Sequence, residues 1–203
     1  PFDRYTKNAD GAIEDTVSYR QGQNVKTYTG WEPRFSARYR LSQKSSVKLG
    51  WVRNYQYIHL ASFSALGLPS DLWLPSSDVI QPQIGSQLSF GYFHNFQRNT
   101  YEASVEVFYK QMDNLIEYRE GASPNENISD NPDNNLTFGS GESYGVELFI
   151  KKNSGRLTGW IGYTWSKSIR FFDDLNNGKS FLAIYDRPHD ISIVGNYKLN
   201  EKW

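Results

Sequence analysis

The sequence predicts an all-β protein: an antiparallel, up-and-down transmembrane β-barrel, of which this chain forms a partial segment of about seven or eight long strands. Apolar and polar residues alternate with the period of two that places successive side chains on opposite faces of a strand. The clearest runs extend for ten residues or more, the length at which a strand tilted by about 45° crosses a bilayer. Short and long connections alternate between these runs, which is typical of outer-membrane barrels.

The alternation is clearest from position 144, where Tyr144, Val146 and Leu148 share one strand face and Gly145 and Glu147 share the other. Apolar residues recur in the same way along the remaining strands, so residues 33–203 are expected to form the barrel segment. We expect strands near 33–41, 46–57, 84–96, 101–118, 143–152, 157–169 and 188–199.

The polar N-terminal residues 1–32 are expected to form an extracellular loop or a short hairpin around Gln21–Asn24. Prolines between 58 and 83 prevent a continuous strand there. Residues 119–142 are rich in Asn, Asp, Gly and Pro, so they are interpreted as a loop. The short connections are 42–45, 97–99, 153–155 and 200–202, and the long ones are 58–83, 119–142 and 170–187.

Aromatic residues beside the short turns fit the interfacial girdle of a membrane barrel. They are Tyr39, Phe96, Tyr101, Tyr197 and Trp203.

The composition removes several other classes of protein. The 22 basic and 22 acidic residues balance, which argues against nucleic acid as a partner. The chain has no cysteine and therefore no disulfide or thiolate metal site. No apolar run reaches about 18 residues, so no transmembrane helix is expected. A soluble β-sandwich, such as a carbohydrate-binding domain, also alternates, but the strand lengths and the unequal connections argue against it.

Strand count leaves two membrane alternatives. An open sheet in lipid would leave unpaired amides, so either residues 1–30 supply an eighth strand or the chain is part of a larger barrel. The first alternative is a small eight-stranded outer-membrane barrel acting as an adhesin or structural anchor. The second is favoured because the chain stops at Trp203, one residue into a further strand.

Several collinear stretches resemble the C-terminal half of the barrel of TonB-dependent outer-membrane receptors, particularly those of the Bacteroidetes type. They are EPRFSARYRL (32–41), YQYIHL (55–60), LPSDLWLPSSDVIQPQ (68–83), YEASVEVFYKQMDNLIEY (101–118), ESYGVELFIKKNSGRLTGWIGYTWSKS (142–168) and YDRPHDISIVGNYKLNEKW (185–203).

This resemblance implies a barrel of 22 strands with a plug domain in its lumen. It also implies an outer-membrane location and the import of a scarce ligand, such as a siderophore, cobalamin, an oligosaccharide or a peptide, with energy relayed by TonB. The expected partners are outer-membrane lipid, the plug, the remaining barrel strands, TonB through the plug, and a surface lipoprotein. No enzymatic activity and no resident cofactor are expected.

Charged residues on the polar faces are expected to line the lumen and to pair with the plug. They are Arg34, Arg38, Arg40, Glu102, Glu106, Lys110 and Glu147.

Apolar residues of the connection 58–83 are candidates for contact with a ligand or with a lipoprotein lid, or else they pack the loop over the barrel rim. They are Leu68, Leu72, Trp73 and Leu74.

His189 lies in the motif YDRPHD between two carboxylates, which could suggest acid-base chemistry or ligand contact. No nucleophile or metal ligand accompanies it, so a polar network where the loop re-enters the wall is favoured. Two Asp- and Asn-rich stretches carry the oxygen ligands that Ca²⁺ accepts, but they lack EF-hand spacing. They are Asp130–Asn135 and the set Asp173, Asp174, Asn176 and Asn177.

Overall fold

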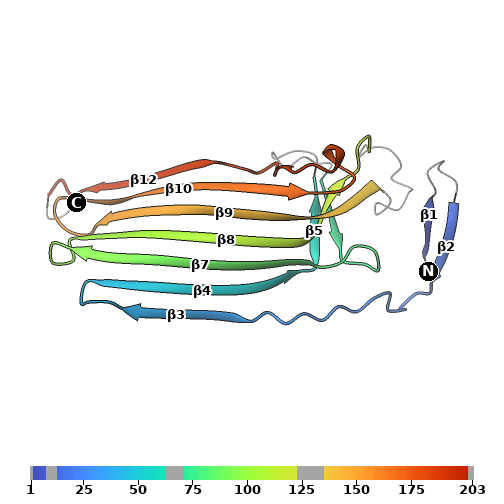
Figure 1. Cartoon of the computed structure of the whole chain (residues 1–203), viewed down its shortest axis with the longest axis horizontal. Helices are drawn as coiled ribbons and strands as arrows, with labels where there is room; N and C mark the ends of the chain where they lie inside the picture. Colours follow the sequence, from blue (N-terminus) through green and yellow to red (C-terminus); the bar gives the residue numbers. More distant parts are fainter. Residues whose placement is uncertain (1, 8–12, 63–70, 123–134, 201–203) are drawn as a thin grey trace.

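One antiparallel sheet dominates the computed structural model, which describes residues 2–7, 13–62, 71–122 and 135–200 (Figure 1). Neighbouring long strands are consecutive along the chain, and β3 and β12 lie at opposite sides of the sheet without pairing with each other. The sheet is therefore up-and-down, as predicted, and it is open. Its long strands are β3 (Arg34–Arg40), β4 (Ser45–Gln56), β7 (Gln83–Phe96), β8 (Tyr101–Tyr118), β9 (Leu136–Lys152), β10 (Leu157–Phe171) and β12 (His189–Tyr197).

The two ends of the sheet differ in their connections (Figure 1). The short turns lie together at one end, called here the short-turn end, and the long connections lie at the other, called the loop end. At the loop end, the hairpin of β5 (Ile58–Ala61) and β6 (Leu72–Pro75) runs across the direction of the long strands. The two-residue β11 (Phe181–Leu182) pairs with β10, after the 3-10 turn η2 (Asn176–Gly178).

Cross-strand register gathers the apolar side chains onto one face of the sheet. Val47 of β4 pairs with Tyr92 of β7, which in turn pairs with Val105 of β8. The pattern continues through the middle of β9, β10 and β12. A slip of one residue there would reverse the faces. One row across this apolar face is Tyr39, Val47, Tyr92, Val105, Leu148, Tyr163 and Ile191.

The middle of the sheet is a single layer. Side chains of the apolar face such as Phe90, Val107 and Ile193 are exposed, and the buried hydrophobic residues among those described all lie at the loop end. A soluble sandwich would pack this face against a second sheet, so the sandwich alternative is wrong. The described N-terminal strands β1 (Phe2–Lys7) and β2 (Ile13–Tyr19) pair only with each other, and so they do not complete a small eight-stranded barrel.

A small core anchors the loop end. Ile116 of β8 and Leu136 of β9 are buried against Ala61 and Ile80 of the connection that contains β5 and β6. Along the unbroken alternation of β9, Leu136 lies on the same face as Val146 and Leu148. The connection therefore folds back over the outer side of the strands, beyond their apolar middle.

The predicted beginning of the strand at 143 is wrong, because β9 begins at Leu136. Its first residues pair with the last residues of β8, Leu115–Tyr118. Gly139 and Gly141 suggested a loop, but they serve close packing instead. A Cβ at Gly139 would overlap the carbonyl oxygen of Phe171, and one at Gly141 would come within 2.9 Å of the carbonyl oxygen of Ile169.

The hairpin expected at Gln21–Asn24 is also wrong. A turn does occur there, with the amide of Gln23 donating to the carbonyl of Arg20 at 3.0 Å, but residues 23–33 that follow form no strand. The hairpin is instead the β1–β2 pair. The extended segment is fixed by side chains, because the Tyr28 hydroxyl donates to the carbonyl of Ser77 at 2.6 Å. No helix in the described part of the chain is long and apolar enough to cross a membrane.

Candidate functional site

The candidate site is the polar face of the sheet, which lies opposite the apolar face. Its central row passes from Arg38 on β3 through Lys48, Gly91 and Glu106 to Glu147 on β9. Gly91 carries no side chain at the middle of the row, and neighbouring side chains lie over it: a Cβ there would come within 2.8 Å of Phe93 Cε2 and 2.9 Å of Glu106 Cγ. The row therefore has two cations on one side of Gly91 and two carboxylates on the other.

On each side of Gly91, two residues of like charge lie directly opposite each other on neighbouring strands. Arg38 pairs directly with Lys48, and Glu106 pairs directly with Glu147. Opposite residues in an antiparallel pair have Cβ atoms about 4.5–5.5 Å apart, and like charges there are destabilising. Glu106 and Glu147 make no hydrogen bond or ion pair with any residue that the structure describes. This carboxylate pair therefore offers a site for a cationic group.

The seven lumen candidates all lie on this polar face, as their shared strand registers require. Some have local partners: the Arg38 Nε donates to Ser46 Oγ at 3.1 Å, and Asn153 Nδ2 donates to Glu102 Oε1 at 2.7 Å. Sequence reasoning left Lys48 and Asp190 out of the set, although their alternation already assigned them to the polar side. The full predicted set is Arg34, Arg38 and Arg40 on β3, Glu102, Glu106 and Lys110 on β8, and Glu147 on β9.

Aromatic residues bound the apolar face near both ends of its band. On β8 the band runs from Tyr101 to Tyr109, nine residues by its numbering, within the roughly 9–11 needed to cross a bilayer. Tyr109 donates from its hydroxyl to Glu142 Oε2 at 2.9 Å, and Tyr144 packs edge-on against Trp165 at 6.2 Å. The predicted girdle residues Tyr39, Phe96, Tyr101 and Tyr197 lie by the short turns, whereas Trp203 lies outside the described residues.

The apolar candidates of the connection 58–83 differ in their exposure. Leu74 packs against the loop-end core, whereas Leu72 and Trp73 are 40% and 67% exposed. Leu68 lies outside the described residues. The packing of Leu74 agrees with a loop folded over the rim, and contact of Trp73 with a ligand or a surface lipoprotein stays a prediction.

His59 of β5 is a buried polar residue that the sequence analysis did not single out. Its side chain is completely buried, and Nε2 lies 3.0 Å from Ser76 Oγ. Its Nδ1 is buried without a hydrogen-bond partner. Burial lowers the pKa of His59 below its ordinary value of 6.5. The ring therefore serves as a neutral part of the loop-end packing.

His189 does not lie among the long loops. It begins β12 opposite Trp165, and its Nδ1 lies 2.8 Å from the Tyr163 hydroxyl. The preceding residues form the polar network expected at the re-entry point: Asp186 Oδ1 accepts from the amide of Ser168 at 2.7 Å, and the Ser166 hydroxyl donates to the carbonyl of Arg187 at 3.3 Å.

The Asn- and Asp-rich stretch that leads into η2 makes hydrogen bonds that fix its own loop. Asp174 Oδ2 accepts from the Thr137 hydroxyl at 3.0 Å, and Asn176 Nδ2 donates to the carbonyls of Lys179 and Ser180. Within the described ranges, no group of three or more His, Cys, Asp or Glu side chains could hold a metal ion. Residues 130–134 lie outside these ranges, and a loop calcium stays a prediction.

Comparisons with known proteins agree with this geometry. Residues 2–203 match the family described as TonB dependent receptor-like, beta-barrel. A solved structure described as the FpvAI–pyocin S2 complex contains a chain similar over 93% of this chain, with a TM-score of 0.58 and 14% identity. At that identity the likeness shows the fold alone. This chain spans 22% of the length of that chain.

Among curated proteins, no sequence matches this one significantly. The family match covers nearly all residues, and the structure contains the open up-and-down sheet that a segment of a large barrel requires. The chain belongs to the TonB-dependent receptor-like β-barrel family.

Proposed function

We propose that this chain forms part of the wall of an outer-membrane receptor that imports a scarce ligand with energy relayed by TonB. The ligand classes are siderophores, cobalamin, oligosaccharides and peptides, and the receptor is of the Bacteroidetes type that the sequence resembles. The observation that carries the proposal is the separation of the sheet into one exposed apolar face and one polar face. Such a wall is stable only between lipid and a hydrated lumen.

The import proposal is tested by deleting the receptor gene in its native cell and, separately, removing TonB. Uptake is measured with a ferric siderophore, cyanocobalamin, a maltooligosaccharide and a peptide mixture, each supplied as the limiting nutrient. We expect uptake of one class to require both the receptor and TonB. Uptake of every class without either protein would contradict the proposal.

The polar face is proposed to hold the plug domain. Glu106 and Glu147 lack a partner among the described residues and repel each other, and cationic side chains of the plug would offset this repulsion. Arg38 and Lys48 form the opposite arrangement and would take plug carboxylates. The plug would thus be oriented by two patches of opposite charge on one row of the wall.

The plug proposal is tested with the double variant Glu106→Gln and Glu147→Gln in the full receptor. Removing one side of a buried charge pair costs about 2–5 kcal/mol, so we expect a looser plug and increased entry of vancomycin into cells. Glu102→Gln is the matched control, because this carboxylate is already bonded to Asn153. An equal effect of the control, or none from the double variant, would argue against the plug contact.

A further inference from the structure

A shallow groove of about 320 Å³ crosses β9, β10 and β12 near the short-turn end. This volume lies near the lower limit for small-molecule sites, which is about 300 Å³. Most of the residues that line it occupy apolar-face positions, and its surface is almost entirely apolar. Six of these apolar-face residues have side chains larger than glycine's. They are Tyr101, Ile150, Lys152, Leu157, Ile161 and Ile193.

Two opposed glycines create the groove. Gly159 of β10 pairs with Gly195 of β12, and both occupy apolar-face positions between larger residues. On the same face, Ile161 and Ile193 form the next pair in one direction, and Leu157 and Tyr197 form the next pair in the other. The glycine pair therefore leaves a gap between the larger side chains of the apolar face.

A cation lies at the mouth of the groove. Lys152 is half-buried, and its Nζ lies 5.9 Å from the centre of the Tyr101 ring. No described carboxylate forms an ion pair with it. Two further cations, Arg156 and Lys198, are neighbours at the same end of the sheet, where the amide of Lys198 donates to the carbonyl of Arg156 at 2.9 Å.

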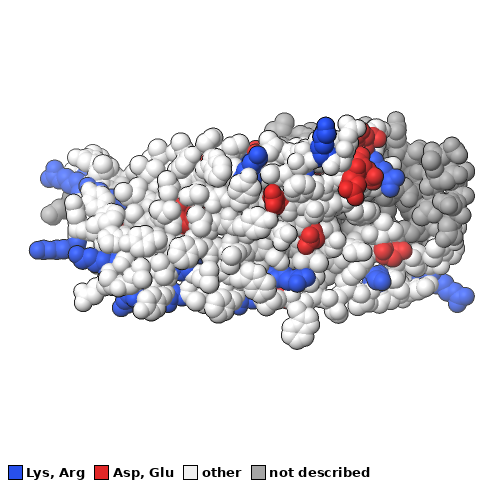
Figure 2. All heavy atoms as spheres, viewed as in Figure 1, with Lys and Arg blue, Asp and Glu red and all other residues white. Residues whose placement is uncertain are grey.

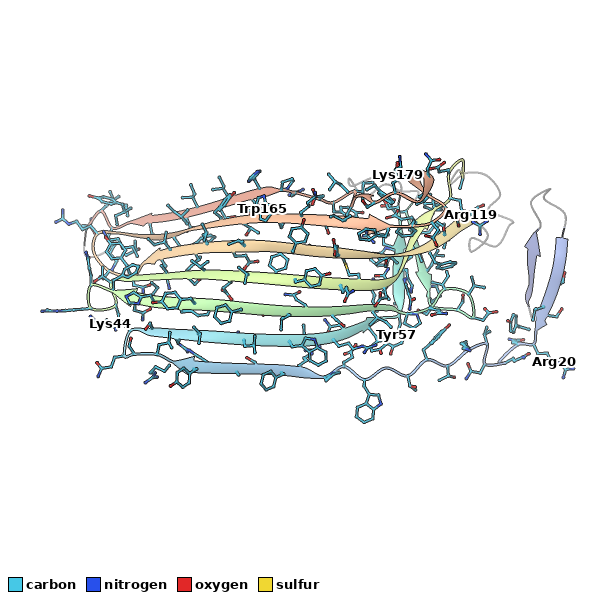
Figure 3. All side chains as sticks on the ribbon, viewed as in Figure 1. Arg20, Lys44, Tyr57, Arg119, Trp165 and Lys179 are labelled. Carbon is cyan, nitrogen blue, oxygen red and sulfur yellow. The ribbon has the colours of Figure 1, made fainter. Side chains whose placement is uncertain are left out.

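Most charged side chains at the short-turn end are cationic. In the view of Figure 2, lysine and arginine atoms extend from this end, and Lys44 is labelled there in Figure 3. The described carboxylate at this end is Glu102, which accepts from Asn153. The described cations are Arg40, Lys44, Arg98, Lys151, Lys152, Arg156 and Lys198.

We propose that the groove binds one anionic glycerophospholipid, with an acyl chain over Gly159 and Gly195 and its phosphate at Lys152. A phospholipid joins in one molecule the two chemistries that the groove presents, an apolar trough and an adjacent cation. Lysine and arginine at the membrane surface attract anionic lipid, and the short turns of such barrels face the phospholipid leaflet on the periplasmic side. The inference rests on the chain being the wall of an outer-membrane receptor.

The test uses the full receptor in detergent micelles and native mass spectrometry, with dioleoyl phosphatidylglycerol and dioleoyl phosphatidylcholine as probes. Gly195→Leu places an apolar side chain in the groove, and a Cβ at Gly195 meets no atom within 4 Å. We expect this variant to lose about tenfold in affinity for phosphatidylglycerol. Its control is Ala37→Leu, which also places a leucine on the apolar face, at an exposed position of β3 outside the groove.

The second variant, Lys152→Gln, separates charge from shape. We expect it to lower the affinity for phosphatidylglycerol by about fivefold and to leave the affinity for phosphatidylcholine unchanged. Lys44→Gln, at a different turn of the same end, should change neither. Unaltered phosphatidylglycerol binding in both groove variants would overturn the proposal, as would equal losses in the two controls. If Gly195→Leu fails to fold, Lys152→Gln alone decides. Lipid adducts are counted without ligand uptake, so failure here leaves the import proposal standing.

Discussion

At the residue scale, the two opposed glycines differ in what they tolerate. Gly159 has a φ of +153°, and a Cβ there would overlap the carbonyl oxygen of Val194, whereas Gly195 has open space. We expect Gly159→Ala to destabilise the receptor by more than about 2 kcal/mol. Gly195→Ala should change stability by less than about 1 kcal/mol. Urea unfolding of both variants in lipid vesicles measures the difference, and equal midpoints would show that the backbone contact is not limiting.

His59 predicts a pH dependence for the loop-end packing. Its pKa is lowered by burial, so when the pH falls below about 6.5 the opened segment takes up the proton first. The stabilisation is therefore complete above this pH and is lost as the pH falls toward the lowered pKa. Hydrogen exchange of residues 58–61 should accelerate at acidic pH in the native receptor. His59→Leu should abolish this pH dependence, and its persistence in that variant would assign it to another group.

At the scale of elements, β8 contains a bulge that joins the wall to a long connection. The register shifts between Met112 and Leu115, and Asn114 adopts a φ of +57°. Asn114 Nδ2 also donates to the carbonyl of Pro82 at 2.9 Å, just before β7. The bulge sets the position of Ile116 in the loop-end core, because each shift by one residue exchanges the faces of a strand.

Substitutions at Asn114 should separate its two contributions. Asn114→Gly keeps the left-handed backbone and loses one hydrogen bond, which costs about 0.5–1.5 kcal/mol. Asn114→Val loses the bond and adds at least about 1–2 kcal/mol of backbone strain. Limited proteolysis between residues 76 and 83 should therefore increase in the order native, Gly, Val. Equal cleavage of the two variants would mean that the hydrogen bond, not the backbone conformation, fixes the bulge.

The sequence predicted the elements wherever alternation was uninterrupted. The strand predicted at 101–118 matches β8, and the lumen set lies on one face because face assignment follows directly from a period of two. The sequence-based prediction failed at Gly139 and Gly141, because glycine is common both in loops and at positions of close packing. These two glycines suggested a loop, but they permit close packing inside β9. The sequence alone also could not predict the groove at Gly159 and Gly195. Which residues of two strands lie opposite each other is known only when the register of the strands is known.

At the scale of the whole molecule, the buried hydrophobic clusters of the described wall lie at one end only. The loop end contains buried clusters around Leu136 and Phe172, whereas the apolar face in the middle of the sheet is exposed within the described structure. Backbone pairing alone does not bury the apolar face, so this face needs a further apolar surface, such as lipid, to cover it. The segment is thus expected to be stable only within its complete barrel.

The two faces make opposite predictions for the same substitution at one depth. Leu148 and Thr164 lie one register step apart on β9 and β10, Leu148 on the apolar face and Thr164 opposite Glu147 on the polar face. An arginine facing lipid near the bilayer centre costs about 2–4 kcal/mol, so Leu148→Arg should lower the unfolding midpoint strongly. Thr164→Arg gains an acidic neighbour and should change it little. If Thr164→Arg proved the more damaging of the two in vesicles, the faces would be assigned the wrong way round, and both the plug contact and the lipid groove would have to be reversed.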